Sequence, residues 1–314
     1  MTPERPALNV NFERLRVLGA LGIVCFHTQS GTISSIGYAG LPVFILITIM
    51  LSVRREPAPF GAFVKSKAAR LLLPWAAWVL IYLASEIAIT VVRHEPIDPV
   101  LGRINPFFGT QVILWYLPFA FAALLLTQRL HGALLKLRGG LGLVGALALA
   151  AFLVAVVPWL LGDPSSLPAP APQFVFATPG VLWGMSMGYA RELGRRQMAL
   201  GLGLSVVGVF LGGVLLLAID EHHGAIDLLL AYGIGLPLVC LAVLWPGERL
   251  DAMTRWLAPL TYGIYLDHAL ANLVLYRIPG YAHDNFVMGV LILFAAAAVM
   301  TAIFKKVPLV KRIV

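Results

Sequence analysis

Two ionisable side chains eleven residues apart stand in an apolar stretch near the start of the chain. Arg16 is followed by ten uncharged residues and then by His27. In an α-helix this spacing is three turns plus about 20°, so both side chains would share one face, about 16 Å apart along the axis. An ionisable group inside a membrane span is costly and is by default a candidate functional residue. A second interpretation stays open, in which a neutral His27 hydrogen-bonds a neighbouring helix as part of the packing.

Cations gather after the second apolar segment. They are Lys65, Lys67 and Arg70, and Arg14 adds another at the start of the first segment. Lys67 and Arg70 are three residues apart, so on a helix they would share a face and could grip one polyanion. The alternative is that these cations only anchor the chain at the cytoplasmic surface of a membrane.

Further polar and aromatic residues lie within later apolar segments. Glu86 is expected at a depth similar to that of His27, where the two could pair and orient the imidazole; otherwise Glu86 points to the outer water layer. Trp115 and Tyr116 open the fourth segment and are candidate substrate contacts or members of an aromatic belt. His268 is either a site residue or a hydrogen-bonded link between helices.

The elements that must position these residues are membrane-spanning helices. Of the 314 residues, 60% are hydrophobic and 12% are charged, which excludes an ordinary soluble protein. Ten apolar segments have roughly the 20 residues that cross a bilayer. They cover residues 13–31, 36–53, 71–92, 110–128, 141–161, 174–190, 199–219, 225–245, 257–277 and 286–304. The predicted fold class is an all-α integral membrane protein with one bundle over residues 1–314.

The basic residues predict the orientation of this bundle. If the N-terminus is cytoplasmic, the inner side holds all of the 23 Lys and Arg residues except Arg93, Arg103 and Arg277. Cytoplasmic loops carry an excess of Lys and Arg, so the sequence predicts ten spans with both termini cytoplasmic. The net charge of +8 then reflects membrane topology, and we expect no nucleic-acid partner.

Two further patterns bear on the chemistry. Gly180, Gly184 and Gly188 recur every four residues, which predicts a helix face that packs closely on a neighbour. Gly184 and Gly188 also form a G-x-S-x-G pattern around Ser186. A nucleophile elbow requires a strand, a sharp turn and a helix, so we expect no hydrolase site. The two cysteines lack His/Cys ligand spacing, and we expect no metal.

Three motifs in this order resemble those of the acyltransferase-3 family of integral membrane O-acyltransferases. The first is Leu15-Arg16 with His27 eleven residues later. The second is the basic run Phe63…Lys67-x-x-Arg70…Pro74, and the third is Thr261-Tyr262-Gly263-Ile264-Tyr265-Leu266-x-His268; Trp115-Tyr116-Leu117 is a weaker fourth.

The chain also departs from the family pattern. Lys67 stands where the family has the first arginine of R-x-x-R, and Glu13 stands where an aspartate is common. Phe44-Ile45-Leu46-Ile47-Thr48-Ile49 replaces Phe-Phe-x-x-Ser-Gly. The resemblance is therefore to a divergent member, and it leaves acyl type and acceptor open.

The resemblance implies transfer of an acyl group, with acetyl expected, from cytoplasmic acyl-CoA to a hydroxyl of an extracytoplasmic or lipid-linked glycan. It implies a multi-pass protein of the bacterial inner membrane, surrounded by lipid, in a polysaccharide-synthesis complex or a homo-oligomer. His27 would remove the hydroxyl proton or be acylated itself. The expected site residues are catalytic His27, Arg16 and Glu86, acyl-CoA-binding Arg14, Lys65, Lys67 and Arg70, and substrate-binding Trp115, Tyr116 and His268.

Two other functions remain open at this point. One is a glycan exporter or transporter whose intramembrane polar residues line a path, and the other is a noncatalytic membrane subunit of a polysaccharide-synthesis complex. The sequence shows no repeat at a fixed period and no obvious inverted halves, which disfavours a secondary transporter.

Overall fold

The computed structural model describes residues 9–28, 32–53, 59–134, 140–219, 223–245, 247, 249–276, 286–308 and 310–314. Within these ranges the regular structure is helical, and the β-type pairing is an isolated bridge between Asn105 and Gly109. The prediction of an all-α protein is therefore confirmed.

Each predicted apolar segment overlaps one long helix. These helices are α1 (Val10–Thr28), α3 (Gly40–Ser52), α4 (Phe60–Val92), α6 (Tyr116–Leu134), α7 (Gly140–Leu161), α8 (Ala171–Ala190), α9 (Arg195–Ile219), α10 (His223–Leu244), α12 (Thr261–Leu275) and α13 (Phe286–Phe304). The shorter elements are α2 (Thr32–Gly37), α5 (Asp98–Leu101), α11 (Ala252–Leu257) and the 3-10 turns η1 (Val112–Trp115), η3 (Pro164–Ser166), η4 (Ala258–Leu260) and η5 (Val310–Arg312).

Several of these helices are long and apolar enough to cross a membrane. By length and composition, the described residues contain five such stretches: Ser34–Ser52, Phe60–Val92, Val112–Leu134, Gly140–Leu161 and Phe286–Phe304. Large apolar side chains such as Phe210 of α9 and Met288 of α13 are exposed, as expected of surfaces that face lipid. The count of ten spans and the cytoplasmic termini stay predictions.

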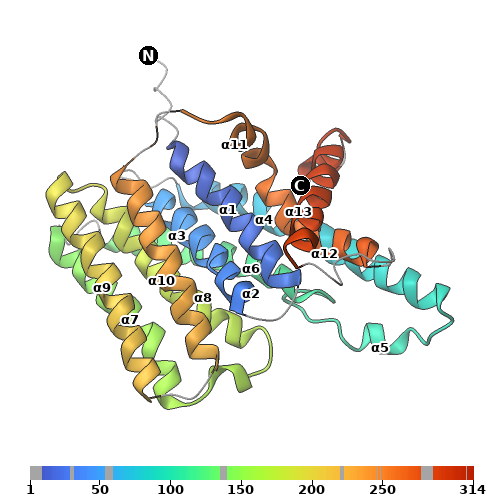
Figure 1. Cartoon of the computed structure of the whole chain (residues 1–314), viewed down its shortest axis with the longest axis horizontal. Helices are drawn as coiled ribbons and strands as arrows, with labels where there is room; N and C mark the ends of the chain where they lie inside the picture. The colour runs from blue at the N-terminus through green and yellow to red at the C-terminus, as the bar shows by residue number, and fades with distance from the viewer. Residues whose placement is uncertain are drawn as a thin grey trace.

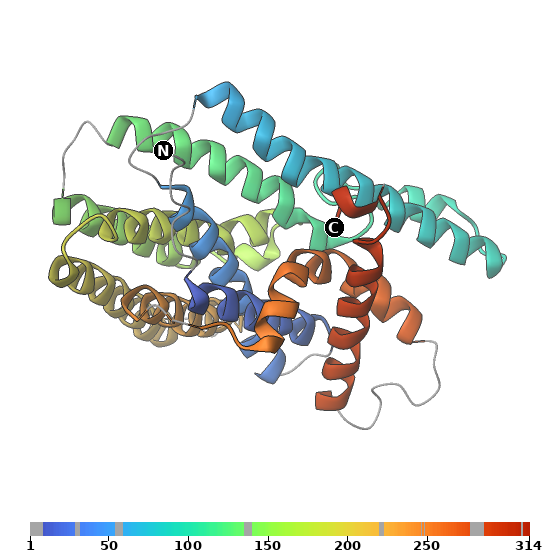
Figure 2. The same cartoon turned by 90° about the horizontal axis from the view of Figure 1, so that it is seen from above.

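The helices form two groups joined by α1 and α3 (Figures 1 and 2). Helices α7, α8, α9 and α10 pack together on one side, and α3 contacts both α8 and α10. On the other side α12 packs on α13, and α1 contacts both of them as well as α3. Helix α4 runs along the edge of the second group (Figure 2).

Glycines allow α3 to approach two neighbours very closely. A Cβ on Gly40 would lie 2.2 Å from the carbonyl oxygen of Gly19 in α1, and one on Gly188 would lie 2.6 Å from the Val53 Cβ. The closely packed glycine face predicted for α8 is therefore confirmed. Ser186, on that helix, is buried and donates to the Val144 carbonyl at 2.9 Å, so it is no nucleophile elbow.

The basic run, which precedes the apolar segment predicted over residues 71–92, lies inside α4, so the helix begins earlier than that segment. The helix begins at Phe60, and alanines, lysines and an arginine, all good helix formers, fill its first turns. Pro74 lies within α4, and because it has no N–H it leaves the carbonyl of Arg70 without its usual partner. The Tyr262 hydroxyl donates to that carbonyl at 3.1 Å, which attaches the start of α12 to the first half of α4.

Candidate active site

A cavity of about 470 Å³ lies where the last turns of α1, α4 and α12 meet. Its polar lining includes His27 of α1, Glu86 of α4, Arg93 just after α4, Gln111 just before η1 and Asn272 of α12. His27 is exposed there instead of being packed into the core. We call this region the cavity end.

Helical spacing brings the other lining residues to the cavity. On α4, Tyr82 and Glu86 are four residues apart, and on α12, Asn272 and Tyr276 have the same spacing. The Tyr82 hydroxyl donates to the Leu266 carbonyl at 2.7 Å and holds α4 against α12. Four lining residues were not predicted from the sequence: Tyr82, Asn272, Tyr276 and Gln111. Tyr82, Asn272 and Tyr276 could have been found, because they are polar residues at helical spacing near the ends of apolar segments.

The connection between α4 and α6 holds the carboxylate of Glu86. Gln111 Nε2 donates to Glu86 Oε1 at 2.7 Å, and an Arg103 guanidinium nitrogen lies 3.7 Å from Oε2. In the described part of the chain no hydrogen bond or ion pair joins Glu86 to His27. This pairing, one of the two possibilities that the sequence left open, is not seen, although both residues line one cavity. The connection supplies Glu86 with other partners.

The imidazole beside His27 is that of His268. The two ring centroids are 5.2 Å apart and the ring planes are inclined by 34°. His268 is fully buried, and its Nδ1 lies 2.9 Å from the Tyr265 carbonyl oxygen and 3.2 Å from that of Ile264. His268 thus lies behind His27 rather than in the cavity wall.

The opposite ends of two of these helices, α1 and α4, carry the predicted cations, and we call this region the basic end. Lys65 and Arg70 are exposed, and the ammonium of Lys67 lies 5.2 Å from the centroid of the Phe63 ring. Because α4 is continuous here, Lys67 and Arg70 share a face, as predicted if this run is helical. These cations do not line the cavity.

Arg16 lies at the same end on α1. Its guanidinium is 2.8 Å from the Glu13 carboxylate, and 33% of its side chain is exposed. In the interior, the Tyr116 ring contacts that of Tyr265, with centroids 5.7 Å apart.

Trp115 has a different environment from its neighbour Tyr116. Its ring is buried and packs against the rings of Phe119 and Phe174, with centroids 5.6 and 6.0 Å away. Neither Trp115 nor Tyr116 lines the cavity, so the described geometry places both of these predicted substrate contacts outside it.

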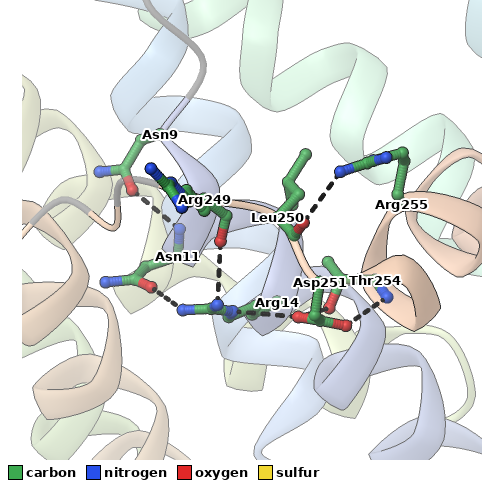
Figure 3. A network of polar contacts seen from close by, with 8 residues as sticks. All are labelled: Asn9, Asn11, Arg14, Arg249, Leu250, Asp251, Thr254 and Arg255. Carbon is green, nitrogen blue, oxygen red and sulfur yellow. Dashed lines mark hydrogen bonds and ion pairs between the residues drawn. The ribbon is translucent and has the colours of Figure 1, made fainter.

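Arg14 takes part in a network at the protein surface (Figure 3). Its guanidinium donates to Asn11 Oδ1 at 3.1 Å, to the Arg249 carbonyl at 3.0 Å and to Asp251 Oδ2 at 3.4 Å. The backbone N–H of Thr254 donates to Asp251 at 2.8 Å, the Thr254 hydroxyl does likewise, and both hold the pKa of Asp251 at about 2. Arg14 therefore joins α1 to the segment that leads into α11.

The comparison with protein families agrees with these motifs. The acyltransferase-3 model, described as an acyltransferase domain, matches residues 9–305, nearly the whole chain. No protein of curated function and no solved structure matches the chain. The matched range includes both the cavity end and the basic end. The chain is thus a membrane acyltransferase and belongs to the acyltransferase-3 family.

Proposed function

We propose that this enzyme transfers an acyl group, with acetyl expected, from cytoplasmic acyl-CoA to a hydroxyl of an extracytoplasmic or lipid-linked glycan. The observation that carries the proposal is the exposure of His27 in a polar cavity where α1, α4 and α12 end, while cations occupy the opposite ends of α1 and α4. A polyanionic donor is bound by cations, whereas the hydroxyl groups of a sugar are bound by side chains that donate and accept hydrogen bonds. The two regions offer these two kinds of group.

The size and lining of the cavity suit a sugar. Its volume of about 470 Å³ falls within the range of about 300–1,000 Å³ usual for small-ligand sites. Gln111 and Asn272 can donate to and accept from hydroxyl groups, and Glu86 can accept from them. These side chains would hold the acceptor with one hydroxyl beside His27.

His27 has the chemistry required for the transfer. As a general base it takes the proton of the acceptor hydroxyl while the oxygen attacks the thioester carbonyl. The carbon–sulfur bond then breaks, and the imidazolium returns the proton to the leaving thiolate, which yields an ester and free coenzyme A. An alternative route, in which His27 is first acylated, uses the same residues.

The donor would bind at the basic end and extend its acyl arm toward His27. Lys65, Lys67 and Arg70 supply cations for the phosphates, and Arg16 lies deeper along α1. The Tyr265 ring, which contacts those of Tyr116 and His268 with centroid distances of 5.7 and 6.4 Å, would line the path of this arm. This geometry requires the basic end to face the cytoplasm, in line with ten spans and cytoplasmic termini.

Transfer across a sealed membrane tests the proposal. The protein is reconstituted in vesicles, its orientation is determined by protease protection, and radiolabelled acetyl-CoA and a glycan acceptor are placed on chosen sides. We expect labelled glycan only when the donor faces the basic end and the acceptor faces the cavity end. Labelling only when both reactants face the same side, or movement of glycan without acylation, would refute it.

A further inference from the structure

We infer that His268 is a positioning residue for His27. In this arrangement a neutral His268 accepts a hydrogen bond at Nε2 from a ring N–H of His27, and the other nitrogen of His27 is directed into the cavity. The catalytic consequence rests on the function proposed for His27, whereas the protonation pattern of His268 does not.

The hydrogen bonds of His268 determine its tautomer. Its Nδ1 faces two backbone carbonyls, those of Tyr265 at 2.9 Å and Ile264 at 3.2 Å. Because a carbonyl oxygen only accepts hydrogen bonds, Nδ1 must carry the proton. In a neutral imidazole the other nitrogen is then an unprotonated acceptor, so Nε2 of His268 presents a lone pair.

This lone pair has no partner among the described residues. Nε2 is buried, and the whole residue has no exposed surface. A buried acceptor without a hydrogen bond costs free energy, so a donor is expected nearby. The structure shows no bond between the two rings, but their centroid separation of 5.2 Å leaves room for one N–H···N bond of about 3 Å once a ring nitrogen of His27 is turned toward Nε2.

No described residue hydrogen-bonds to the His27 ring, so nothing in that part of the chain holds it away from Nε2. A bond to His268 would place the proton of neutral His27 on the inner nitrogen and leave a lone pair facing the cavity. That is the form a general base or nucleophile needs. The bond to His268 also gives the N–H on the inner nitrogen of His27 an acceptor when His27 becomes an imidazolium. The Glu86 carboxylate does not hold His27 in this way, because it accepts a hydrogen bond from Gln111 and lies 3.7 Å from Arg103.

Two substitutions separate this role from simple packing. The amide oxygen of Gln in His268→Gln can reach the position of Nε2, whereas the shorter side chain of His268→Asn reaches only that of Nδ1. We expect His268→Asn to lower kcat by about 10²-fold, as for a misplaced catalytic group, with KM for both substrates unchanged. His268→Gln should recover most of that loss. Equal loss in both variants, or a change in KM alone, would overturn the proposal.

Nitrogen-15 NMR of histidine-labelled protein in nanodiscs tests the pair without measuring activity. His268, assigned by its absence in His268→Gln, should show a protonated Nδ1 and an unprotonated Nε2. Its Nε2 signal should shift in His27→Ala. A protonated Nε2 would refute the pair. So would an Nε2 signal that His27→Ala leaves unchanged, because the partner of Nε2 would then be a water molecule and not His27. Full acyl transfer by His27→Ala would instead refute the proposed function and leave the NMR result standing.

Discussion

The cavity end and the basic end share helices α1 and α4 but use their ionisable groups differently. At the basic end Arg14 and Arg16 are paired with carboxylates, while Lys65 and Arg70 point into solvent. At the cavity end the carboxylate of Glu86 is paired, and the exposed His27 ring stands between the cavity and a buried second imidazole.

This difference matches what each end is proposed to do. Long exposed cations can bind a polyanion in several geometries, so the loss of one weakens binding without abolishing it. A group that moves a proton must be held in one place, because a small displacement costs much of the rate. Substitutions at the two ends should therefore separate donor binding from turnover.

The largest effect is expected for His27→Ala. Removal of the general base should lower acyl transfer by about 10²–10⁴-fold, while acyl-CoA affinity stays unchanged because the basic end is intact. Transfer of radiolabelled acetyl groups gives the rate, and calorimetry gives the affinity for acetyl-CoA. A rate close to that of the wild type would remove His27 from the mechanism.

Substitution at the basic end should have the complementary effect. Arg70→Ala or Lys67→Ala should weaken acyl-CoA binding by about tenfold, the usual loss for one charge-assisted hydrogen bond, with little change in kcat. Arg191→Ala, which removes an exposed cation after α8, is the matched control and should leave binding unchanged. If all three variants lost affinity equally, these cations would act only through the overall charge.

A smaller effect is expected for the acceptor. Gln111→Ala removes a hydrogen-bonding group from the cavity and a partner of Glu86, so KM for the glycan should rise by about fivefold. KM for acetyl-CoA should stay the same in steady-state kinetics that vary each substrate in turn. A rise in the donor KM instead would place the donor, not the acceptor, beside Gln111.

The smallest effect concerns stability and pH at the Arg14 network. The folded protein holds the pKa of Asp251 at about 2, below its ordinary value of 3.8, so the carboxylate stabilises the fold above pH 3.8. That stabilisation is lost as the pH falls toward 2. Thermal unfolding in detergent should show a small decrease over this range that Asp251→Asn reduces. An equal decrease in the variant would assign it to other groups.

Part of the site was predictable from the sequence because it depends on spacing along one helix. The distance from Arg16 to His27 and the shared face of Lys67 and Arg70 follow from helical geometry alone. The same rule would have brought Tyr82 and Asn272 to the cavity. Hydropathy predicted the helices, because apolar segments bury their backbone polar groups most simply in that form.

Contacts between helices were decided by the tertiary structure. The path of the α4–α6 connection gives Glu86 its partners, and the pairing with His27, which depth alone left open, is not seen among the described residues. Helix rotation, which hydropathy does not determine, places His268 behind His27.

Composition and periodicity thus determined the helices, the family motifs and which helix ends are basic, because these depend on neighbours along the chain. Only the tertiary structure decided which polar groups meet. A side chain's partner depends on the rotation and depth of a second helix, and the residues of one helix alone do not specify these.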